Sequence, residues 1–333
     1  MHFHQWKRRE VITLLGGAAA WPRMAQAQQR ERVRRIGIFI SGTEADPEMR
    51  ARVTAFRGAL ERLGWSEGRN VRFDIRYGSS APERYQGIAK ELVALQPDVI
   101  FAHTTPIVAA LKRETTTVPV VFVSVSDPVG SDLVASLARP GGNITGLLLY
   151  EASITGKWLA MLKEIAPGLA RVALMANPRT TPYDSFLRAA EVAAPALAIE
   201  LVPSRTANAA DIERTIESLA RTPNGGLLVL PDGTSILHRD LILVLTARYR
   251  LPTVYGFRFF VTAGGLMSYG ADILEQHRQA AALVDRILHG SNPADLPVQA
   301  PTRYQTVVNL KTARALGFSV PPGLLVAADE VIE

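Results

Sequence analysis

Carboxylates stand close behind two apolar runs of this chain, and both could bind a charged ligand. The run 118–125 is β-branched and aromatic and is followed by Ser126 and Asp127. The run 226–230 ends two residues before Asp232. In open α/β sheets, the loops at the carboxyl ends of the strands hold small ligands. An enclosed carboxylate can pair there with an ammonium group through a charge-assisted hydrogen bond worth roughly 1.5–3 kcal/mol.

A pair of hydroxyls could receive the opposite charge. Thr104 and Thr105 follow a predicted strand and precede Pro106, where a helix is predicted to begin. The free N–H groups of a helix start carry partial positive charge, so the pair is expected to receive a ligand carboxylate. The alternative is that Thr105 only caps its helix. His103 lies at the same edge, and its simpler interpretation is a structural residue.

Other predicted strand ends add hydroxyls, an amide and aromatic rings, and together these groups match a zwitterion with an apolar side chain. The candidate ligand-binding residues are Ser41, Thr43, Tyr77, Thr104, Thr105, Ser126, Asp127, Asn177, Tyr183, Asp232 and Tyr255. Each has a structural alternative: the aspartates as turn residues, the tyrosines as half-buried packing. The sequence leaves these alternatives open.

An enzyme is the rival class of function. The sequence has no Gly-x-Ser-x-Gly elbow, no His-Glu-x-x-His and no phosphate-binding loop. It also has no cysteine, which removes thiolate nucleophiles and cysteine metal sites. The enzyme alternative is therefore a periplasmic protein that acts on a small polar substrate through Asp127 and Asp232. We expect no catalytic residue, no metal and no cofactor.

Strands and helices alternate twice along the chain, which indicates an α/β protein with two doubly wound lobes. A length of 333 residues fits two lobes better than one core. The predicted strands are 34–40, 71–77, 98–102, 118–125, 143–149, 171–176, 199–202, 226–230, 252–255, 264–270 and 305–309. The predicted helices are 49–63, 82–95, 106–112, 157–164, 185–194, 212–219, 237–249, 275–288 and 311–316.

The basic charge of the chain gathers at its amino terminus. The formal net charge is +6, of which residues 1–27 and residues 28–35 each carry +3. The rest is neutral on balance, so a nucleic-acid surface is not expected. A transcription regulator with similar lobes would also need a DNA-reading headpiece, and other sequence features occupy that place.

Residues 1–27 have the three regions of an export signal. Arg8 and Arg9 precede a short apolar segment, which Ala25-Gln26-Ala27 ends as a small-x-small cleavage site. The arginine pair favours twin-arginine export over general secretion, and a disordered basic tail is the simpler alternative. Without a cysteine for a lipid anchor, we expect cleavage near Ala27 and a protein free in the periplasm.

Several short motifs, taken in order, resemble the ABC-transporter substrate-binding proteins of the tryptophan/tyrosine-binding type. They are the export signal, Ser126-Asp127-Pro128, the turn 139–146, Asn177-Pro178, Ser268-Tyr269-Gly270 and the segment 320–325. No single motif is decisive, and the resemblance covers essentially the whole mature chain.

That resemblance implies the type I periplasmic-binding fold, with two Rossmann-like lobes joined by three hinge crossovers. By analogy, lobe 1 comprises residues 33–150 plus 257–290, and lobe 2 comprises residues 151–256 plus 291–333. The implied function is the periplasmic solute-binding component of an ABC importer. It would close around an amino acid, aromatic ones included, or a related carboxylate. The implied partners are ABC permease subunits in the inner membrane, and a monomer is expected.

Overall fold

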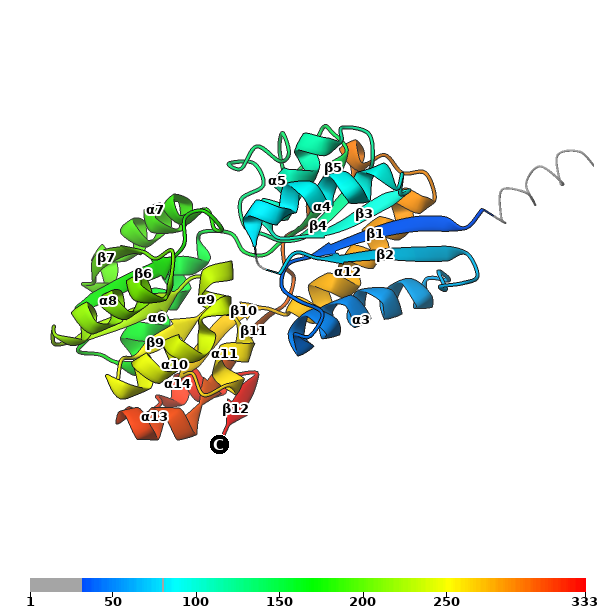
Figure 1. The fold of residues 1–333 in the computed structure, drawn as a ribbon. Coiled ribbons are helices and arrows are strands. Elements are labelled where there is room, and N and C mark those ends of the chain that lie inside the picture. The colour runs from blue at the N-terminus through cyan, green and yellow to red at the C-terminus, as the bar shows by residue number, and fades with distance from the viewer. Residues whose placement is uncertain (1–31, 80) are drawn as a thin grey trace, which may run out of the picture.

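The structure is a computed structural model that describes residues 32–79 and 81–333, and it has two lobes, each built on its own sheet (Figure 1). The sheet of the first lobe has five parallel strands in the order β2-β1-β3-β4-β5, which is a doubly wound order. Its strands are β1 (Arg34–Ile40), β2 (Val71–Tyr77), β3 (Val99–His103), β4 (Val120–Val125) and β5 (Ile144–Leu148). Its helices are α3 (Pro47–Arg62), α4 (Pro82–Ala94), α5 (Thr105–Glu114) and α12 (Ile273–Leu288).

Helices cover both faces of this sheet, which explains why its central strands are apolar on both sides. Every residue of β3 and β4 is buried. On one face α3 packs beside α12, and Phe56 stacks on Phe101 with ring centroids 4.0 Å apart. On the other face α4 and α5 contribute Leu92 and Leu111. The strand predicted over residues 118–125 is confirmed as β4, which is buried on both faces.

The sheet of the second lobe has seven strands in the order β12-β11-β10-β9-β8-β6-β7, and only the pairing of β10 with β11 is antiparallel. Its strands are β6 (Arg171–Ala176), β7 (Glu200–Arg205), β8 (Gly225–Val229), β9 (Thr253–Tyr255), β10 (Met267–Ala271), β11 (Tyr304–Asn309) and β12 (Glu330–Ile332). Its helices are α6 (Ile154–Ile165), α7 (Tyr183–Ala193), α8 (Ala209–Ala220), α9 (Gly233–Leu237), α10 (Arg239–Arg248), α11 (Arg258–Thr262), α13 (Leu310–Leu316) and α14 (Pro322–Val326).

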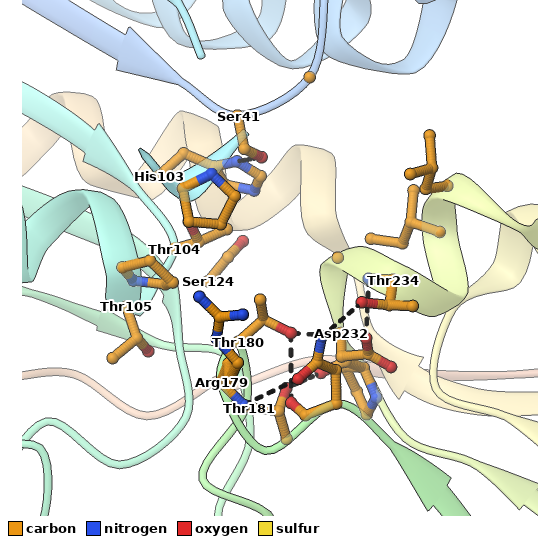
Figure 2. A pocket seen from close by; sticks show the side chains of 18 of the residues that line it. Ser41, His103, Thr104, Thr105, Ser124, Arg179, Thr180, Thr181, Asp232 and Thr234 are labelled. Carbon is orange, nitrogen blue, oxygen red and sulfur yellow. Dashed lines mark hydrogen bonds between the residues drawn. The ribbon is translucent and has the colours of Figure 1, made fainter. Parts of the chain in front are cut away.

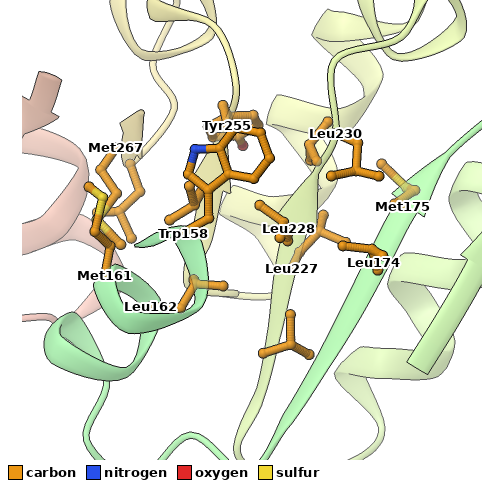
Figure 3. Packing of buried hydrophobic residues seen from close by; sticks show 14 of the residues in the cluster. Trp158, Met161, Leu162, Leu174, Met175, Leu227, Leu228, Leu230, Tyr255 and Met267 are labelled. Carbon is orange, nitrogen blue, oxygen red and sulfur yellow. The ribbon is translucent and has the colours of Figure 1, made fainter. Parts of the chain in front are cut away.

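One continuous apolar cluster fills the second lobe, and Trp158 of α6 lies within it (Figure 3). The side chain of Trp158 is fully buried, and its Nε1 atom donates to the backbone oxygen of Tyr269 at 2.6 Å. Its ring meets Tyr150 edge-on at 5.5 Å and stacks on Phe186 at 6.2 Å. Trp158 therefore ties α6 to both β10 and α7.

The chain crosses between the lobes three times, which confirms the expected architecture of two doubly wound lobes and three crossovers. The crossovers join β5 to α6, β10 to α12, and the segment after α12 to β11. They lie close together, because Asp272 donates its backbone N–H to the oxygen of Arg303 at 3.3 Å, and Gln276 donates to the oxygen of Leu148 at 2.7 Å. Such a bundle of short crossovers can act as a hinge.

The structure corrects the expected lobe boundaries in the second half of the chain. Strand β10 belongs to the second sheet, so the chain returns to the first lobe only at α12 and not at residue 257. Leu296 and Val298 pack in the first lobe, so the last crossover follows residue 299 rather than residue 291. The sequence could not show this, because the antiparallel partner of β10 comes from beyond α12.

Within the described residues, no helix is both long and apolar enough to cross a membrane. The expected export signal, residues 1–27, lies outside the described part of the chain.

Candidate functional site

A cavity of about 270 Å³ lies between the lobes, and both lobes line it (Figure 2). It is bordered by the loops that follow β1, β3 and β4 in the first lobe, and β6 and β8 in the second. Because parallel strands end at a common edge, this is where the polar strand ends were expected to meet. The volume is just below the range of about 300–1,000 Å³ found for small-ligand pockets, so it favours a ligand about the size of an amino acid.

Two residues with left-handed backbone face the cavity from the ends of neighbouring strands. Thr104 has φ 73° and Ser124 has φ 59°. Neither is a glycine, and each such conformation costs about 1–3 kcal/mol, which proteins retain mainly at functional sites. The Oγ atom of Ser124 is buried and has no hydrogen-bond partner among the described residues. A ligand atom in the cavity could supply that partner.

The first turn of α5 opens toward the cavity. Thr104 is the N-cap residue, yet its side chain makes no capping hydrogen bond, and Thr105 is already inside the helix. Capping therefore does not occupy either hydroxyl, which favours the ligand-binding interpretation of the pair. The partial positive charge of a helix start is also available at this wall.

Arg52 of α3 adds a buried cation to the same wall. Its side chain is 1% exposed, and its Nη1 atom lies 3.1 Å from Nε2 of His103. The other ring nitrogen of His103, Nδ1, lies 2.7 Å from Oγ of Ser41. Burial, with the nearby Arg52 charge, holds the pKa of His103 well below its ordinary value, so the ring is neutral near pH 7.

Asp232 faces the cavity from the second lobe and supplies the opposite charge. The residue is 4% exposed, and its Oδ1 atom accepts from the N–H groups of Thr234 at 2.7 Å and Ser235 at 3.1 Å. Its Oδ2 atom accepts from the Ser235 hydroxyl. Burial raises the pKa of Asp232 to about 6, and these hydrogen bonds offset part of that effect. Oδ2 keeps acceptor capacity for a ligand ammonium group.

Asn177 joins the two polar loops of the second lobe. Its Nδ2 atom donates to Oγ1 of Thr234 at 2.8 Å, and its Oδ1 atom accepts from the N–H of Arg179 at 2.9 Å. The hydroxyl of Thr180 lies 3.5 Å from Oδ1 of Asp232. Asn177 therefore holds the loop after β6 against the start of α9 while it lines the cavity.

The rest of the cavity wall combines apolar side chains with the charged Asp46, Glu83 and Arg179. Tyr85 and Phe257, both less than a tenth exposed, contribute aromatic rings from opposite lobes, and Met49 and Leu149 line the cavity beside them. Arg179 reaches toward the first lobe from its loop (Figure 2). The cavity therefore combines charged ends with room for an apolar group.

Six of the eleven residues predicted as ligand-binding line the cavity: Ser41, Thr104, Thr105, Ser126, Asn177 and Asp232. The structure does not place the other five at its wall. Among these, Thr43 is exposed beyond the cavity, and Tyr77 packs against the apolar core beside α3.

Tyr183 and Tyr255 are corrected from ligand contacts to core residues of the second lobe. The hydroxyl of Tyr183 donates to the oxygen of Leu174 and accepts from the N–H of Ser204, both at 2.8 Å. The ring of Tyr255 stacks on Phe260 with centroids 4.8 Å apart. Tyr183 is the first residue of α7, and its hydrogen bonds to Leu174 and Ser204 hold it against β6 and β7. Tyr255 lies on β9, where successive residues alternate between faces, and its ring falls on a covered face.

The sequence reading missed residues that helices bring to the cavity. The position of Arg52 could have identified it, because this arginine falls within the apolar stripe of α3 formed by Met49, Val53 and Phe56. A cation at such a position points inward and needs a partner. Tyr85 of α4 carries no comparable signal in the sequence.

Asp127 lies outside the cavity wall and instead joins the two lobes. Its Oδ2 atom accepts from the hydroxyl of Ser185 on α7 at 3.0 Å, and its Oδ1 atom accepts from the N–H of Gly130 at 2.8 Å. Asp127 is thus a turn residue, as its structural alternative stated, with an added contact across the cleft.

We expect Asp127→Ala and Ser185→Ala to weaken ligand binding by similar, small factors of less than about tenfold, because each removes one hydrogen bond that holds the lobes together. The double variant should bind the ligand about as tightly as each single variant, because both changes remove the same hydrogen bond. Titration calorimetry can measure these affinities. Ser185→Ala is the cleaner change, since Asp127→Ala also breaks a turn. A loss above about hundredfold in Asp127→Ala alone would place Asp127 on the ligand.

A protein family described as ABC transporter substrate binding protein matches residues 36–332 of this chain. The tyrosine-binding protein of Clostridioides difficile (strain R20291) is 25% identical over 279 residues, which cover 84% of this chain and 80% of that protein.

Solved structures show the same fold. The ABC domain from Streptococcus pneumoniae in complex with L-Trp is 21% identical, with a TM-score of 0.83 over 90% of this chain and 99% of that one. The ligand-free, open structure of a substrate binding protein with adhesive properties from Clostridium difficile is 25% identical, with a TM-score of 0.70 over 90% and 99%. The type I periplasmic-binding fold expected from the sequence is confirmed.

Proposed function

Because the chain belongs to the family of ABC transporter substrate-binding proteins, we propose that it captures a zwitterionic amino acid between its lobes. Substrate-binding proteins bind a small ligand and deliver it to an ABC permease, and the chain is not an enzyme. The class of ligand is the more specific part of this proposal, and the charged and apolar groups of the cavity support it.

The charge arrangement of the cavity carries the proposal. The buried charges are the Arg52 guanidinium, beside the start of α5 in the first lobe, and the Asp232 carboxylate in the second lobe. Asp46 and Glu83 of the first lobe and Arg179 of the second also line the cavity. An amino acid has a carboxylate and an ammonium group on one carbon, so it can meet both walls at once. Each charged group would then replace water by a partner of opposite sign.

The apolar wall supports an aromatic or large aliphatic side chain. Tyr85 and Phe257 face the cavity from opposite lobes, so a ring between them would contact aromatic surface on both sides. The relatives that bind tyrosine and L-Trp support the same class of ligand. We therefore propose an aromatic amino acid as the first candidate and related carboxylates as the second.

Lobe closure is the proposed mechanism of capture. Ligand would bind one lobe in an open form, and contacts with the other lobe would stabilise the closed form. Three adjacent crossovers provide the hinge, and the polar groups of both lobes complete the site only when the lobes meet. The closed protein would then dock on the inner-membrane permease of an importer, as a monomer exported to the periplasm by the signal in residues 1–27.

A thermal-shift screen tests the ligand class. We expect L-tryptophan, L-tyrosine or L-phenylalanine to raise the melting temperature, since a ligand at 100 times its dissociation constant adds about 2.7 kcal/mol of stability. The N-acetyl and amide derivatives of the same amino acid are matched controls, each lacking one charge, and should give much smaller shifts. Equal shifts with a derivative, or none with any zwitterion, would refute the proposal.

A further inference from the structure

Arg52 is a buried cation without a counter-ion in the part of the chain that the structure describes. Its side chain is 1% exposed, and no Asp or Glu oxygen of the described residues forms an ion pair with it. Its Nε and Nη2 atoms have no hydrogen-bond partner there. Burial of an unpaired charge is strongly unfavourable, so a residue of this kind is expected to serve a ligand or another binding partner. Arg52 lines the cavity between the lobes.

The hydrogen bonds from Arg52 determine where the protons of its neighbours lie. A guanidinium has only donors, so Nη1 of Arg52 donates to Nε2 of His103 across 3.1 Å. Neutral His103 must then carry its proton on Nδ1, and it donates that proton to Oγ of Ser41 across 2.7 Å. Ser41 becomes an acceptor in this bond, so its own hydroxyl hydrogen is left to donate into the cavity.

The surroundings of His103 agree with this arrangement. The side chain of His277 is fully buried beside it, with ring centroids 5.8 Å apart. Nδ1 of His277 lies 2.7 Å from the backbone oxygen of Ile273, which makes Nδ1 the protonated nitrogen. Burial lowers the pKa of His277 to about 3, so its ring is neutral near pH 7 and brings no charge to the group. The carboxylates of Asp46 and Glu48 lie near enough to act on the charge of Arg52, but neither forms an ion pair with it, so a ligand anion could still pair with the guanidinium.

We propose that Arg52, His103 and Ser41 form the subsite for the anionic end of the ligand, with Ser41 as the contact and Arg52 and His103 as positioning residues. Ser41 donates to a ligand carboxylate oxygen, and Arg52 supplies the positive charge behind it. The subsite rests on the proposed function and deepens it. It is continuous with the start of α5, because Thr104 follows His103 directly. A ligand whose carboxylate is replaced by an amide or an ester is selected against.

The proton arrangement can be measured without any ligand. In nitrogen-15 NMR spectra of the full-length protein with labelled histidine, His103 should be the neutral Nδ1–H tautomer near pH 7. Arg52→Met should remove this fixed tautomer, because the donor to Nε2 is gone. An Nε2–H tautomer of His103 in the unchanged protein would overturn the proposal, whatever ligand the cavity takes.

The selectivity is measured with L-tyrosine and L-tyrosinamide as the probes. Selectivity is the dissociation constant of L-tyrosinamide divided by that of L-tyrosine. This ratio should fall by about tenfold to hundredfold in Ser41→Ala and in Arg52→Met. His103→Asn, which keeps a donor near Nδ1, should retain more selectivity than His103→Leu. Arg50→Met is the matched control, because Arg50 is an exposed arginine on the same helix and lies outside the cavity wall.

The stability of Arg52→Met separates a ligand-binding role from a structural one. Replacement of a buried, unpaired charge by an apolar side chain should leave the ligand-free protein at least as stable, while selectivity falls. Unchanged selectivity in Arg52→Met, or its loss only together with the fold, overturns the proposal. An unchanged protein that binds neither probe would instead count against the proposed function, and the tautomer measurement would still decide the proton arrangement.

Discussion

Asp232→Asn is expected to lower the affinity for a zwitterionic amino acid by about hundredfold near pH 7.5. Loss of one partner from an enclosed charge pair costs about 2–5 kcal/mol, largely because the other charge is left unpaired. Asparagine keeps an oxygen that can accept from the N–H groups of Thr234 and Ser235, so the start of α9 should keep its cap. Titration calorimetry with L-tyrosine or L-tryptophan measures the effect.

The matched control is Asp240→Asn in the same lobe, because the side chain of Asp240 is 85% exposed and forms an ion pair with its neighbour Arg239. We expect that change to leave the affinity within about twofold, as exposed ion pairs contribute little. If both variants bound the ligand as tightly as the unchanged protein, the carboxylate of Asp232 would not be the partner of the ammonium group.

The same residue predicts how ligand binding depends on pH. Burial raises the pKa of Asp232 from 3.8 to about 6, so the carboxylate takes up a proton as the pH falls through that value. Affinity should be constant above about pH 7 and fall by about tenfold per pH unit well below 6. Asp232→Asn should flatten this profile. Burial lowers the pKa of His103 well below its ordinary value and that of His277 to about 3, so Asp232 is expected to dominate the profile.

The free energy of unfolding of the ligand-free protein should change with pH in the opposite direction to the ligand affinity. A carboxyl group whose pKa is raised on folding binds its proton more tightly in the folded state. Its contribution to the free energy of unfolding is therefore lost as the pH rises from about 4 to about 6, by roughly 3 kcal/mol in total. Above pH 6, Asp232→Asn should be more stable than the unchanged protein in urea unfolding, while it binds ligand more weakly.

Trp158→Ala is expected to lower the free energy of unfolding by about 3–5 kcal/mol, the range for removal of a large buried aromatic side chain. It would leave a cavity between Tyr150 and Phe186 and remove the donor to the oxygen of Tyr269. Urea unfolding followed by circular dichroism measures the loss.

Two further variants make the Trp158 prediction specific. Trp158→Phe keeps most of the ring volume and should cost less than the alanine variant, because mainly the hydrogen bond is lost. Val192→Ala on α7 is a surface control, since Val192 is 84% exposed, and should change stability by less than about 0.5 kcal/mol. A loss in Trp158→Ala as small as in this control would contradict the packing described for the second lobe.

Much of the secondary structure was readable from local sequence. The predicted strands 34–40, 71–77 and 171–176 agree with the observed β1, β2 and β6 residue for residue. They are short apolar or alternating runs, whose pattern does not depend on distant partners. Strand β7 was predicted too short because it contains Pro203, which an edge strand such as β7 tolerates.

Short elements near the carboxyl terminus were not readable in the same way. Strand β12 has three residues and lies at the edge of the sheet, where it pairs with β11. Strand β10 was found as a strand, but its place in the second sheet depends on an antiparallel partner that follows α12 in the chain. Pairing between distant segments leaves no local signal.

The sequence alone determined the succession of strands and helices and the polar residues at the strand ends. Parallel strands of one sheet end at one edge, which is why Thr104 and Asp232 could be expected near the ligand. Only the tertiary structure decided which groups face each other across the cleft. In the packed lobes, Tyr183 and Tyr255 lie in the core, and Arg52 of α3 lies at the cavity. The direction in which a side chain points depends on what covers each face, and that is a property of the packed lobes.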